Sequence, residues 1–199
     1  NNLKTKTILV TGGAGFIGTH LCGRLLQDGH HVQSLDNYST GSKANHVSGV
    51  IYLEGDTKDI QTLVKDIPDT IYHLGEYSRV EQSFEDVARV LESNVGGTHA
   101  VLEFARTHGC KLIYAGSSTK FADAGIGRDQ SPYAWTKASN TELVKNYGEW
   151  FGLEYAITYF YNVYGPGERG DSKSGTVIGI FSDLYERGEP LAVRLPGTQ

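Results

Sequence analysis

The chain has 199 residues, 39% of them hydrophobic and 11% aromatic, which suits one domain with a sizeable core, or one domain and part of another. Its net charge of −5, without a basic run, argues against nucleic acid or an anionic membrane surface as a partner. No apolar stretch approaches the roughly 18 residues of a membrane span, and no signal-peptide pattern is present. Cys22 and Cys110 are isolated and lack metal or redox spacing, so we expect a cytoplasmic protein without a metal site.

A glycine-rich turn follows the first predicted strand, the apolar run 7–10. Gly12, Gly15 and Gly18 fit the spacing G-x-x-G-x-x-G, and Gly13 with the last two fits G-x-G-x-x-G, the fingerprint of dinucleotide-binding turns. One glycine permits a tight turn at positive φ, one lets the backbone approach a pyrophosphate, and one lets the next helix pack closely. The N-terminus of that helix would offer N–H groups and partial positive charge to the phosphates.

The context of the turn favours a nucleotide site. Ile17, Leu21 and Leu25 recur at helical spacing after it. A second strand over 32–35 ends at Asp36, whose carboxylate could accept hydrogen bonds from both adenosine ribose hydroxyls and would repel a 2′-phosphate. The pattern therefore favours NAD over NADP, and the alternative is an ordinary strand–turn–helix that binds no ligand.

Strands and helices alternate along the rest of the chain. Further strands are predicted at 50–53, 70–74, 111–115 and 154–161, and helices near 59 and over 86–107, 131–151 and 177–187. This alternation is typical of an α/β fold with a doubly wound parallel sheet of the Rossmann type, which binds ligands at the carboxyl ends of its strands.

Two polar side chains have both a cofactor-binding and a structural interpretation. Asp56 could accept a hydrogen bond from the adenine amino group, or it could cap the helix that begins near Asp59. Asn94, within the predicted helix 86–107, could contact a passing cofactor or could be buried and bonded only to backbone. The sequence leaves both choices open.

A tyrosine and a lysine lie one turn apart on the predicted helix 131–151. The i, i+4 spacing of Tyr133 and Lys137 puts phenol and ammonium on one helix face. Because a free tyrosine has a pKa of about 10, ionisation at neutral pH requires lowering it by ~3, or ~4 kcal/mol, which a nearby lysine and an oxidised nicotinamide could supply. The tyrosine would then act as a general base on a sugar hydroxyl, with Ser117 donating a hydrogen bond to the same oxygen. On most helices such a pair is a surface contact, but its place after a nucleotide fingerprint favours catalysis.

Together these motifs resemble the extended short-chain dehydrogenase/reductase family, in particular its nucleotide-sugar epimerases and dehydratases. The matching positions, in chain order, are the glycine turn, Asp36-Asn37, Gly55-Asp56, Asn94, Ser117, Tyr133-x-x-x-Lys137 and Asn162-Val163-Tyr164-Gly165-Pro166. The resemblance implies tightly held NAD, catalysis by Ser117, Tyr133 and Lys137, and a sugar nucleotide near Asn162. It also implies that Lys137 bonds the nicotinamide ribose, and that the protein forms a homodimer through helices 86–107 and 133–151.

The fingerprint and the resemblance together define the expected site. The cofactor-binding residues expected are Gly12, Gly15, Phe16, Ile17, Gly18, Asp36, Asn37, Ser39, Thr40, Gly41, Asp56, Thr57, Leu74, Gly75, Asn94, Tyr133 and Lys137. The substrate-binding residues expected are Ser117, Ser118 and Asn162. Residues 1–165 are expected to form the NAD-binding domain, and 166–199 the beginning of a truncated sugar-nucleotide-binding region, because family members continue well past Pro190-Leu191.

The residues after Ser117 bear on the reaction class. Dehydratases of the family carry an Asp-Glu pair directly after the catalytic threonine, and the related decarboxylases a glutamate two residues after it, whereas Ser118 and Thr119 supply no carboxylate. What remains is oxidation at C4, rotation of the ketone and reduction from the other face. The sequence therefore predicts an NAD-dependent 4-epimerase of the UDP-glucose/UDP-galactose type. The alternatives are a dehydratase or reductase of the same family and a catalytically silent NAD-binding module.

Overall fold

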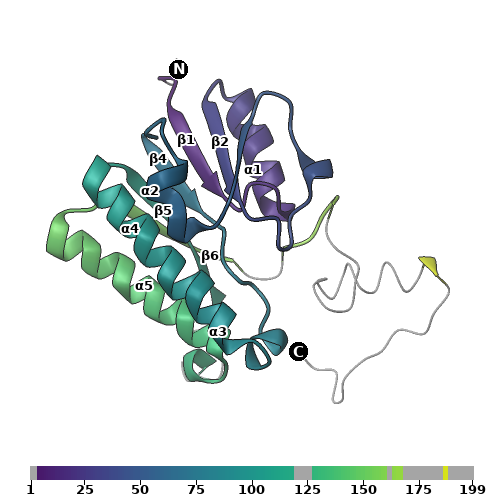
Figure 1. Ribbon diagram of the computed structural model, residues 1–199, viewed down its shortest axis with the longest axis vertical. Helices are drawn as coiled ribbons and strands as arrows, with labels where there is room; N and C mark the ends of the chain where they lie inside the picture. Colours follow the sequence, from purple (N-terminus) through teal and green to yellow (C-terminus); the bar gives the residue numbers. More distant parts are fainter. Residues whose placement is uncertain (1–3, 119–126, 161–162, 168–185, 188–199) are drawn as a thin grey trace. The chain divides into compact units, whose positions relative to one another are not determined.

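The computed structural model describes residues 4–118, 127–160, 163–167 and 186–187. Six strands form one parallel sheet: β1 (Thr7–Thr11), β2 (His31–Asp36), β3 (Ile51–Glu54), β4 (Thr70–His73), β5 (Lys111–Ser117) and β6 (Tyr155–Phe160). Their order across the sheet is β3-β2-β1-β4-β5-β6 (Figure 1). The predicted Rossmann-type parallel sheet is confirmed.

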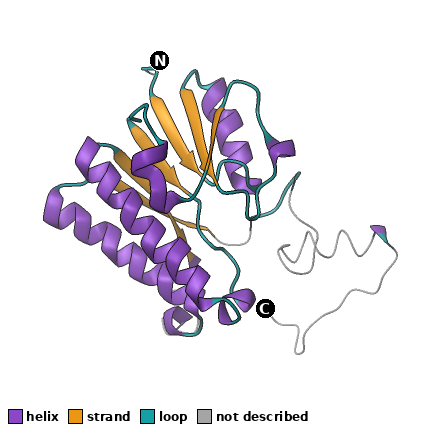
Figure 2. Ribbon diagram, viewed as in Figure 1, coloured by secondary structure: helices purple, strands orange, loops and turns teal. Residues whose placement is uncertain are grey.

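Helices cover both faces of the sheet. They are α1 (Phe16–Gln27), α2 (Ile60–Leu63), α3 (Val87–Val90), α4 (Gly97–His108) and α5 (Pro132–Phe151). The helix α1 lies on one side of the sheet, and α4 and α5 lie side by side on the other (Figure 1, Figure 2). Successive side chains of β1 point to opposite faces of the sheet. Ile8 and Val10 pack beside Cys22 of α1, whereas Leu9 packs in the core that includes Phe104 of α4. A strand buried on both faces reads as a continuous apolar run, which is why its sequence predicted it.

The helix predicted over 86–107 is interrupted in its middle. The helices α3 and α4 are joined by a π-helical segment, Leu91–Gly96, which contains the buried Asn94. The carbonyl oxygen of Asn94 accepts a hydrogen bond from the Asn140 side chain of α5 at 2.8 Å. Short π segments inside helices are frequent at functional sites, and this one fixes α4 to α5.

The helix α5 begins as its sequence predicts. The Ser131 hydroxyl accepts the N–H of Ala134 at 3.0 Å, and Pro132 occupies the first helical position. The helix ends at Gly152, whose φ of +68° suits glycine. The cap and the stop together fix which residues of α5 lie on its buried face.

Two predicted helices differ from expectation or lie outside the described residues. The helix expected near 59 begins as a 3-10 turn, Thr57–Asp59, and continues as the short α2. The helix expected over 177–187 lies outside the described residues except for 186 and 187.

The chain divides into two compact units, Asn1–Tyr161 and Asn162–Gln199. The functions expected of 1–165 and 166–199 remain predictions. Within the residues described, no helix has the length and apolar character needed to cross a membrane.

Candidate functional site

The carboxyl ends of β1 and β4 lie side by side where the strand order reverses. At such a switch point the following loops diverge and leave a crevice for a ligand. Here the two loops touch, because a Cβ on Gly12 would lie 3.0 Å from the Cα of Gly75, and a Cβ on Gly75 would lie 3.0 Å from the nitrogen of Gly12. Gly12 also has a φ of +74°, which other residues rarely adopt. The φ of Gly12 thus favours glycine there, and glycine at both positions lets the two loops pack closely.

The other two glycines of the turn have different roles. A Cβ on Gly18 would lie 2.1 Å from the carbonyl oxygen of Gly12, so only glycine lets α1 pack on the turn. A Cβ on Gly15 would make only an ordinary contact, 3.4 Å from the same oxygen. The N-terminus of α1, with Phe16 and Ile17 in its first turn, has no side-chain cap. An open Gly15 beside an uncapped helix N-terminus fits a diphosphate, which needs close backbone approach and N–H donors.

Asp36 ends β2 and is buried beside the glycine turn. Its Oδ2 accepts the N–H of Ala14 at 2.9 Å, and its Oδ1 accepts the N–H of Tyr38 at 2.8 Å. Each oxygen retains a second lone pair, so the carboxylate can still accept ribose hydroxyls. A Cβ on Gly41 would lie 3.0 Å from the backbone of Ala14, so glycine also lets this loop close over the turn.

Asn37 and Asp56 join the loops that follow β2 and β3. The Nδ2 of Asn37 donates to Oδ1 of Asp56 at 2.8 Å, and its Oδ1 accepts the N–H of Ser39 at 3.0 Å, next to Thr40. Asp56 occupies the N-cap position of the turn Thr57–Asp59, but its side chain makes no capping bond. The capping interpretation is thus right about the position of Asp56, but the carboxylate accepts a hydrogen bond from Asn37 and does not cap the turn.

The side chains of Asn94 and Thr57 contact other residues of the protein. The Oδ1 of Asn94 accepts the N–H of Tyr77 at 2.6 Å, while its Nδ2 donates to the Tyr77 carbonyl at 3.0 Å and to Thr136 Oγ1 at 3.1 Å. These bonds match the structural interpretation of Asn94, with one side-chain partner added. The Oγ1 of Thr57 would lie 2.2 Å from a Cβ on Gly97, so it packs against the start of α4. A cofactor contact from either residue remains a prediction.

Among the predicted catalytic residues, Lys137 reaches the strand that ends at Ser117, and Tyr133 lies one helix turn before it. Tyr133 and Lys137 lie on the buried face of α5 and are 9% and 7% exposed. The Nζ of Lys137 donates to the carbonyl oxygen of Ala115 at 2.7 Å, two residues before Ser117, where β5 ends. Burial rules out the interpretation of the pair as a surface contact.

Three further predicted residues belong to neighbouring loops, and a fourth is outside the part of the chain that the structure describes. The N–H groups of Leu74 and Gly75 donate to Thr11 Oγ1 at 3.0 and 2.9 Å, which holds the loop after β4 against β1. Ser118 follows β5 directly and is half-buried. Asn162 lies outside the described residues.

A buried carboxylate that the sequence analysis missed lies beside the lysine. The side chain of Glu76, directly after Gly75, is 1% exposed, and its Oε2 lies 3.1 Å from the Nζ of Lys137. Its Oε1 accepts the hydroxyl of Thr98 at 2.7 Å, and its Oε2 accepts the hydroxyl of Tyr114 at 3.3 Å. An acidic residue just after a central strand of a parallel sheet is the signal that could have found it.

Glu76 and Lys137 form a charged pair. Burial alone would raise the pKa of Glu76, but Lys137 and His73 lower it to about 2. Burial alone would lower the pKa of Lys137, but the charge of Glu76 outweighs it, and the pKa ends above its usual value. Burial and the nearby carboxylate raise the pKa of Tyr114 well above its usual value, so this tyrosine remains a hydroxyl donor. At neutral pH Lys137 therefore carries its charge inside the protein.

The pair makes stability depend on pH with a definite sign. Because the pKa of Glu76 is lowered from 4.5 to about 2, its contribution is complete above pH 4.5 and is lost as the pH falls towards 2. We expect the free energy of unfolding, measured with urea, to fall by about 2 kcal/mol more in the native protein than in Glu76→Gln between about pH 6 and about pH 3.

The control for this titration is Glu154→Gln. Glu154 pairs with Lys111 at the opposite edge of the sheet, also at 3.1 Å, but its side chain is 74% exposed. This variant should keep the native dependence on pH. Equal slopes in the native protein and in Glu76→Gln would show that folding leaves the pKa of Glu76 unchanged, which would contradict the charged pair.

The chain is similar to known proteins of one family. The chain matches the model of the NAD dependent epimerase/dehydratase family over residues 8–199. It is 35% identical to a Methanocaldococcus jannaschii protein named "Putative UDP-glucose 4-epimerase", over 96% of this chain and 67% of the relative. It is 30% identical to UDP-glucuronic acid decarboxylase 1 of Xenopus tropicalis, over 98% of this chain and 49% of that protein. The crystal structure of a Thermus thermophilus UDP-glucose 4-epimerase with NAD superposes with a TM-score of 0.83 at 30% identity, covering 94% of this chain and 65% of that one.

The chain thus spans about half to two thirds of the length of these relatives. The match confirms the resemblance inferred from the motifs, and with it NAD as the cofactor. Three features of this sequence underlie the resemblance: the glycine turn, the carboxylate at the end of β2 and the buried Tyr133–Lys137 pair. The chain belongs to the NAD-dependent epimerase/dehydratase family.

Proposed function

We propose that the protein catalyses the NAD-dependent 4-epimerisation of a UDP-sugar of the glucose/galactose type. The observation that carries the proposal is the burial of Tyr133 and Lys137 on one face of α5, with Lys137 bonded to the strand that ends at Ser117. The names of the Methanocaldococcus relative and the Thermus structure support the substrate class.

In this reaction the side chains move a proton and hold charge. Tyr133 accepts the proton of the sugar 4-hydroxyl as C4 is oxidised, and it returns the proton to the ketone. Ser117 donates a hydrogen bond to the reacting oxygen, and Lys137 keeps a positive charge beside the phenol. Bound NAD supplies the hydride acceptor and donor. Between the two half-reactions the 4-keto sugar rotates in the site, so that its opposite face is reduced. The configuration at C4 is thereby inverted, and there is no net redox change.

Elimination and decarboxylation have less support, although a decarboxylase is among the relatives. The position after Ser117 is Ser118, which cannot act as a carboxylic acid. Glu76 cannot replace it as a proton donor near neutral pH, because its pKa is about 2 and its carboxylate is bound to Lys137. A reductase would use Ser117, Tyr133 and Lys137 with net redox change, and a silent module would bind NAD without turnover.

A single incubation separates these reactions. We expect proton NMR of UDP-glucose with the protein and NAD to show growth of the UDP-galactose anomeric signal while the NADH absorbance stays near baseline. NADH that changes in step with the substrate would indicate a reductase. A product that has lost water or carbon dioxide would indicate a dehydratase or decarboxylase. Bound NAD with no change in a panel of UDP-sugars would indicate the silent module.

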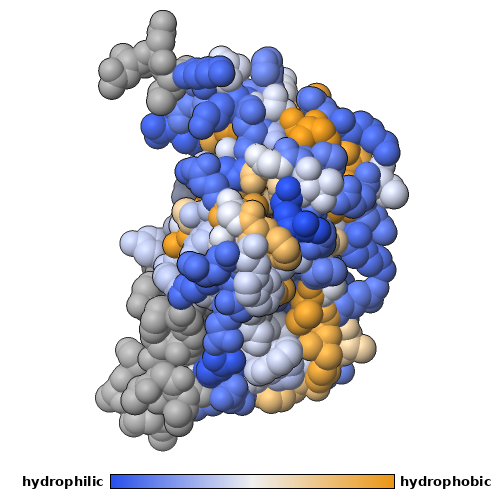
Figure 3. All heavy atoms as spheres, turned by 90° about the vertical axis from the view of Figure 1, so that its left-hand side faces the viewer, coloured by the Kyte–Doolittle hydropathy of each residue, from blue (hydrophilic) through white to orange (hydrophobic). Residues whose placement is uncertain are grey.

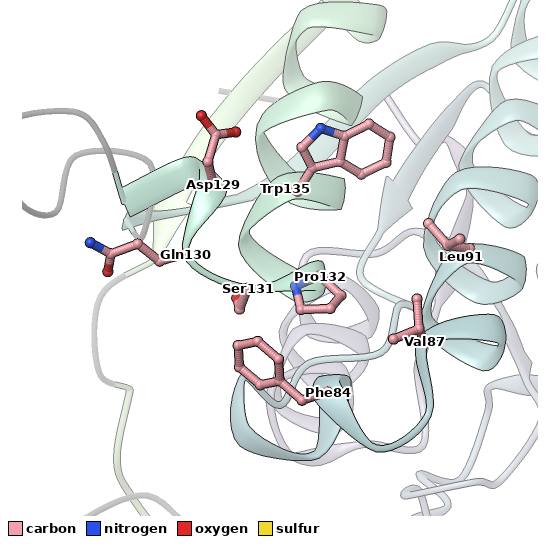
Figure 4. Close-up of a pocket in the computed structure, with 8 residues that line it drawn as sticks. All are labelled: Phe84, Val87, Leu91, Asp129, Gln130, Ser131, Pro132 and Trp135. Atoms are coloured by element: carbon pink, nitrogen blue, oxygen red, sulfur yellow. The ribbon is translucent and has the colours of Figure 1, made fainter.

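We also propose the homodimer that the family resemblance implies. Figure 3 shows apolar patches among the polar atoms of the side that α4 and α5 form. An apolar hollow of about 440 Å³ there is lined by Phe84, Val87, Leu91 and Trp135 among others (Figure 4). Phe84 and Trp135 are 59% and 42% exposed. Exposed apolar residues beside the start of α5 and on the segment that precedes α4 support pairing of two copies through this side.

A reducing, cytoplasmic compartment is part of the same proposal. Cys22 and Cys110 are unpaired and buried. Burial raises the pKa of their thiols to about 12 and about 11. Such thiols act as small apolar core residues, which suits a protein without structural disulfides.

A further inference from the structure

The carboxylate of Glu76 is buried beside the reacting residues, yet the proposed mechanism assigns it no step. It contacts four elements at once: Lys137 on α5, Thr98 on α4, Tyr114 on β5, and His73 on β4, whose Nε2 lies 3.3 Å from its Oε1. A buried ion pair is weak evidence for stability, because removing two charges from water costs about as much as their attraction returns. The pair therefore calls for a functional explanation.

The first consequence of the pair is the position of the ammonium. A lysine ammonium has three N–H donors. One is directed to the Ala115 carbonyl at 2.7 Å and another to Glu76 Oε2 at 3.1 Å. Among contacts with the described residues, one donor is left, and the two anchors decide where it points. The ammonium also lies 5.3 Å from the centre of the Tyr114 ring, which limits its movement on that side.

The second consequence is that Glu76 is held as an acceptor by a directed chain of hydrogen bonds. Thr11 Oγ1 already accepts two N–H groups of the loop after β4, so its own hydrogen is directed to Nδ1 of His73 at 2.7 Å. The Nε2–H of His73 then donates to Thr98 Oγ1 at 2.9 Å, and the Thr98 hydroxyl donates to Glu76 at 2.7 Å. The chain starts in β1, next to the glycine turn, and ends at the carboxylate.

We propose that Glu76 is a positioning residue of the active site, which fixes the Lys137 ammonium at the end of β5 and supplies the counter-charge that keeps it protonated. This inference rests on the proposed function for the catalytic role of Lys137. The titratable groups that face the ammonium are Glu76 from the loop after β4, Tyr114 from β5 and Tyr133 from its own helix, with His73 of β4 behind the carboxylate. Glu76 is the one of these that carries a fixed negative charge at neutral pH.

The direct test follows the charge of Lys137 and needs no turnover. In protein with 13C-labelled lysine side chains, NMR follows the Cε signal of Lys137 with pH, and Lys137→Met assigns it. In the native protein the charge of Glu76 raises the pKa of Lys137 above its usual value, so the midpoint of this titration should lie above that of an exposed lysine. In Glu76→Gln, burial acts without a counter-charge, and we expect the midpoint to fall by about one pH unit or more. An unchanged midpoint would overturn the proposal.

Two variants show whether the shift in the Lys137 midpoint comes from the negative charge at position 76. Glu76→Asp keeps the charge but shortens the reach, so its midpoint should lie between those of the native protein and Glu76→Gln. Glu154→Gln breaks the matched exposed pair with Lys111 and should leave Lys137 unchanged. A shift of the same size in Glu154→Gln would mean a general change of the protein, and it would contradict a specific role of Glu76.

Activity gives a second readout. If Lys137 must be charged for turnover, the alkaline limb of the rate–pH profile moves to lower pH in Glu76→Gln by the same amount as the NMR midpoint. A purely structural role would lower the rate at every pH without moving the limb. If no UDP-sugar is converted, the proposed function fails, whereas the NMR midpoint still tests the position and charge of Lys137.

Discussion

Tyr133→Phe is expected to lower the rate of epimerisation by about 10³-fold, the usual size of a lost general acid–base group. In the proposed mechanism the phenol takes the proton from the 4-hydroxyl, and it lies on the buried face of α5 with Lys137 one turn away. Phenylalanine keeps the ring and its packing, so the fold and NAD binding should remain. Turnover by NMR and NAD binding by calorimetry would separate the two effects.

The matched control is Tyr147→Phe on the same helix. The Tyr147 hydroxyl donates to Glu103 at 2.5 Å, on the far part of α5 from Tyr133. Its loss removes the same chemical group without touching the reacting end of β5, so the rate should stay at the native value. A Tyr133→Phe enzyme that turns over as fast as Tyr147→Phe would exclude Tyr133 as the base.

Gly18→Ala is expected to lose NAD affinity by more than about 10-fold and to lower the free energy of unfolding by about 2–3 kcal/mol, the cost of a methyl group forced into a packed site. The new Cβ would lie 2.1 Å from the carbonyl oxygen of Gly12 and 2.7 Å from the Cα of Gly13. Both are backbone atoms, so the glycine turn itself must move. Thermal unfolding should show a decrease of roughly 5–10 °C.

Gly23→Ala is the control on the same helix. A Cβ on Gly23 would meet nothing within 4 Å, and the residue lies inside α1. Alanine is the better helix former by roughly 0.5–1 kcal/mol, so this variant should be slightly stabilised and should bind NAD as the native protein does. If both alanine variants behaved alike, the close packing of α1 on the turn would not be what requires Gly18.

The sequence predicted the strand, the turn and the helix that form the site because each of these depends on a local sequence pattern. The apolar run of β1, the glycines of the turn and the Ser131-Pro132 start of α5 each depend on neighbours within a few residues. The i, i+4 spacing of Tyr133 and Lys137 likewise needs only the helix that carries them. These features followed from the sequence without knowledge of the sheet order.

The features that the sequence missed or left open depend on partners far along the chain. Glu76 pairs with Lys137, Asn94 bonds Tyr77 and Thr136, and Asp56 holds Asn37 instead of capping its own turn. The π segment between α3 and α4 accompanies such a contact, because its Asn94 carbonyl bonds Asn140. No residue spacing encodes these pairs, which form only when the sheet brings their strands and helices together.

The most direct test of the account is the fate of deuterium at C4 of the sugar. UDP-glucose labelled with deuterium at C4 would be incubated with the protein and NAD in ordinary water. Oxidation and re-reduction by the same bound cofactor predict UDP-galactose that retains the deuterium at C4, with no net NADH. UDP-galactose that has exchanged this deuterium for solvent hydrogen, or the absence of any UDP-galactose, would contradict 4-epimerisation through a transient ketone.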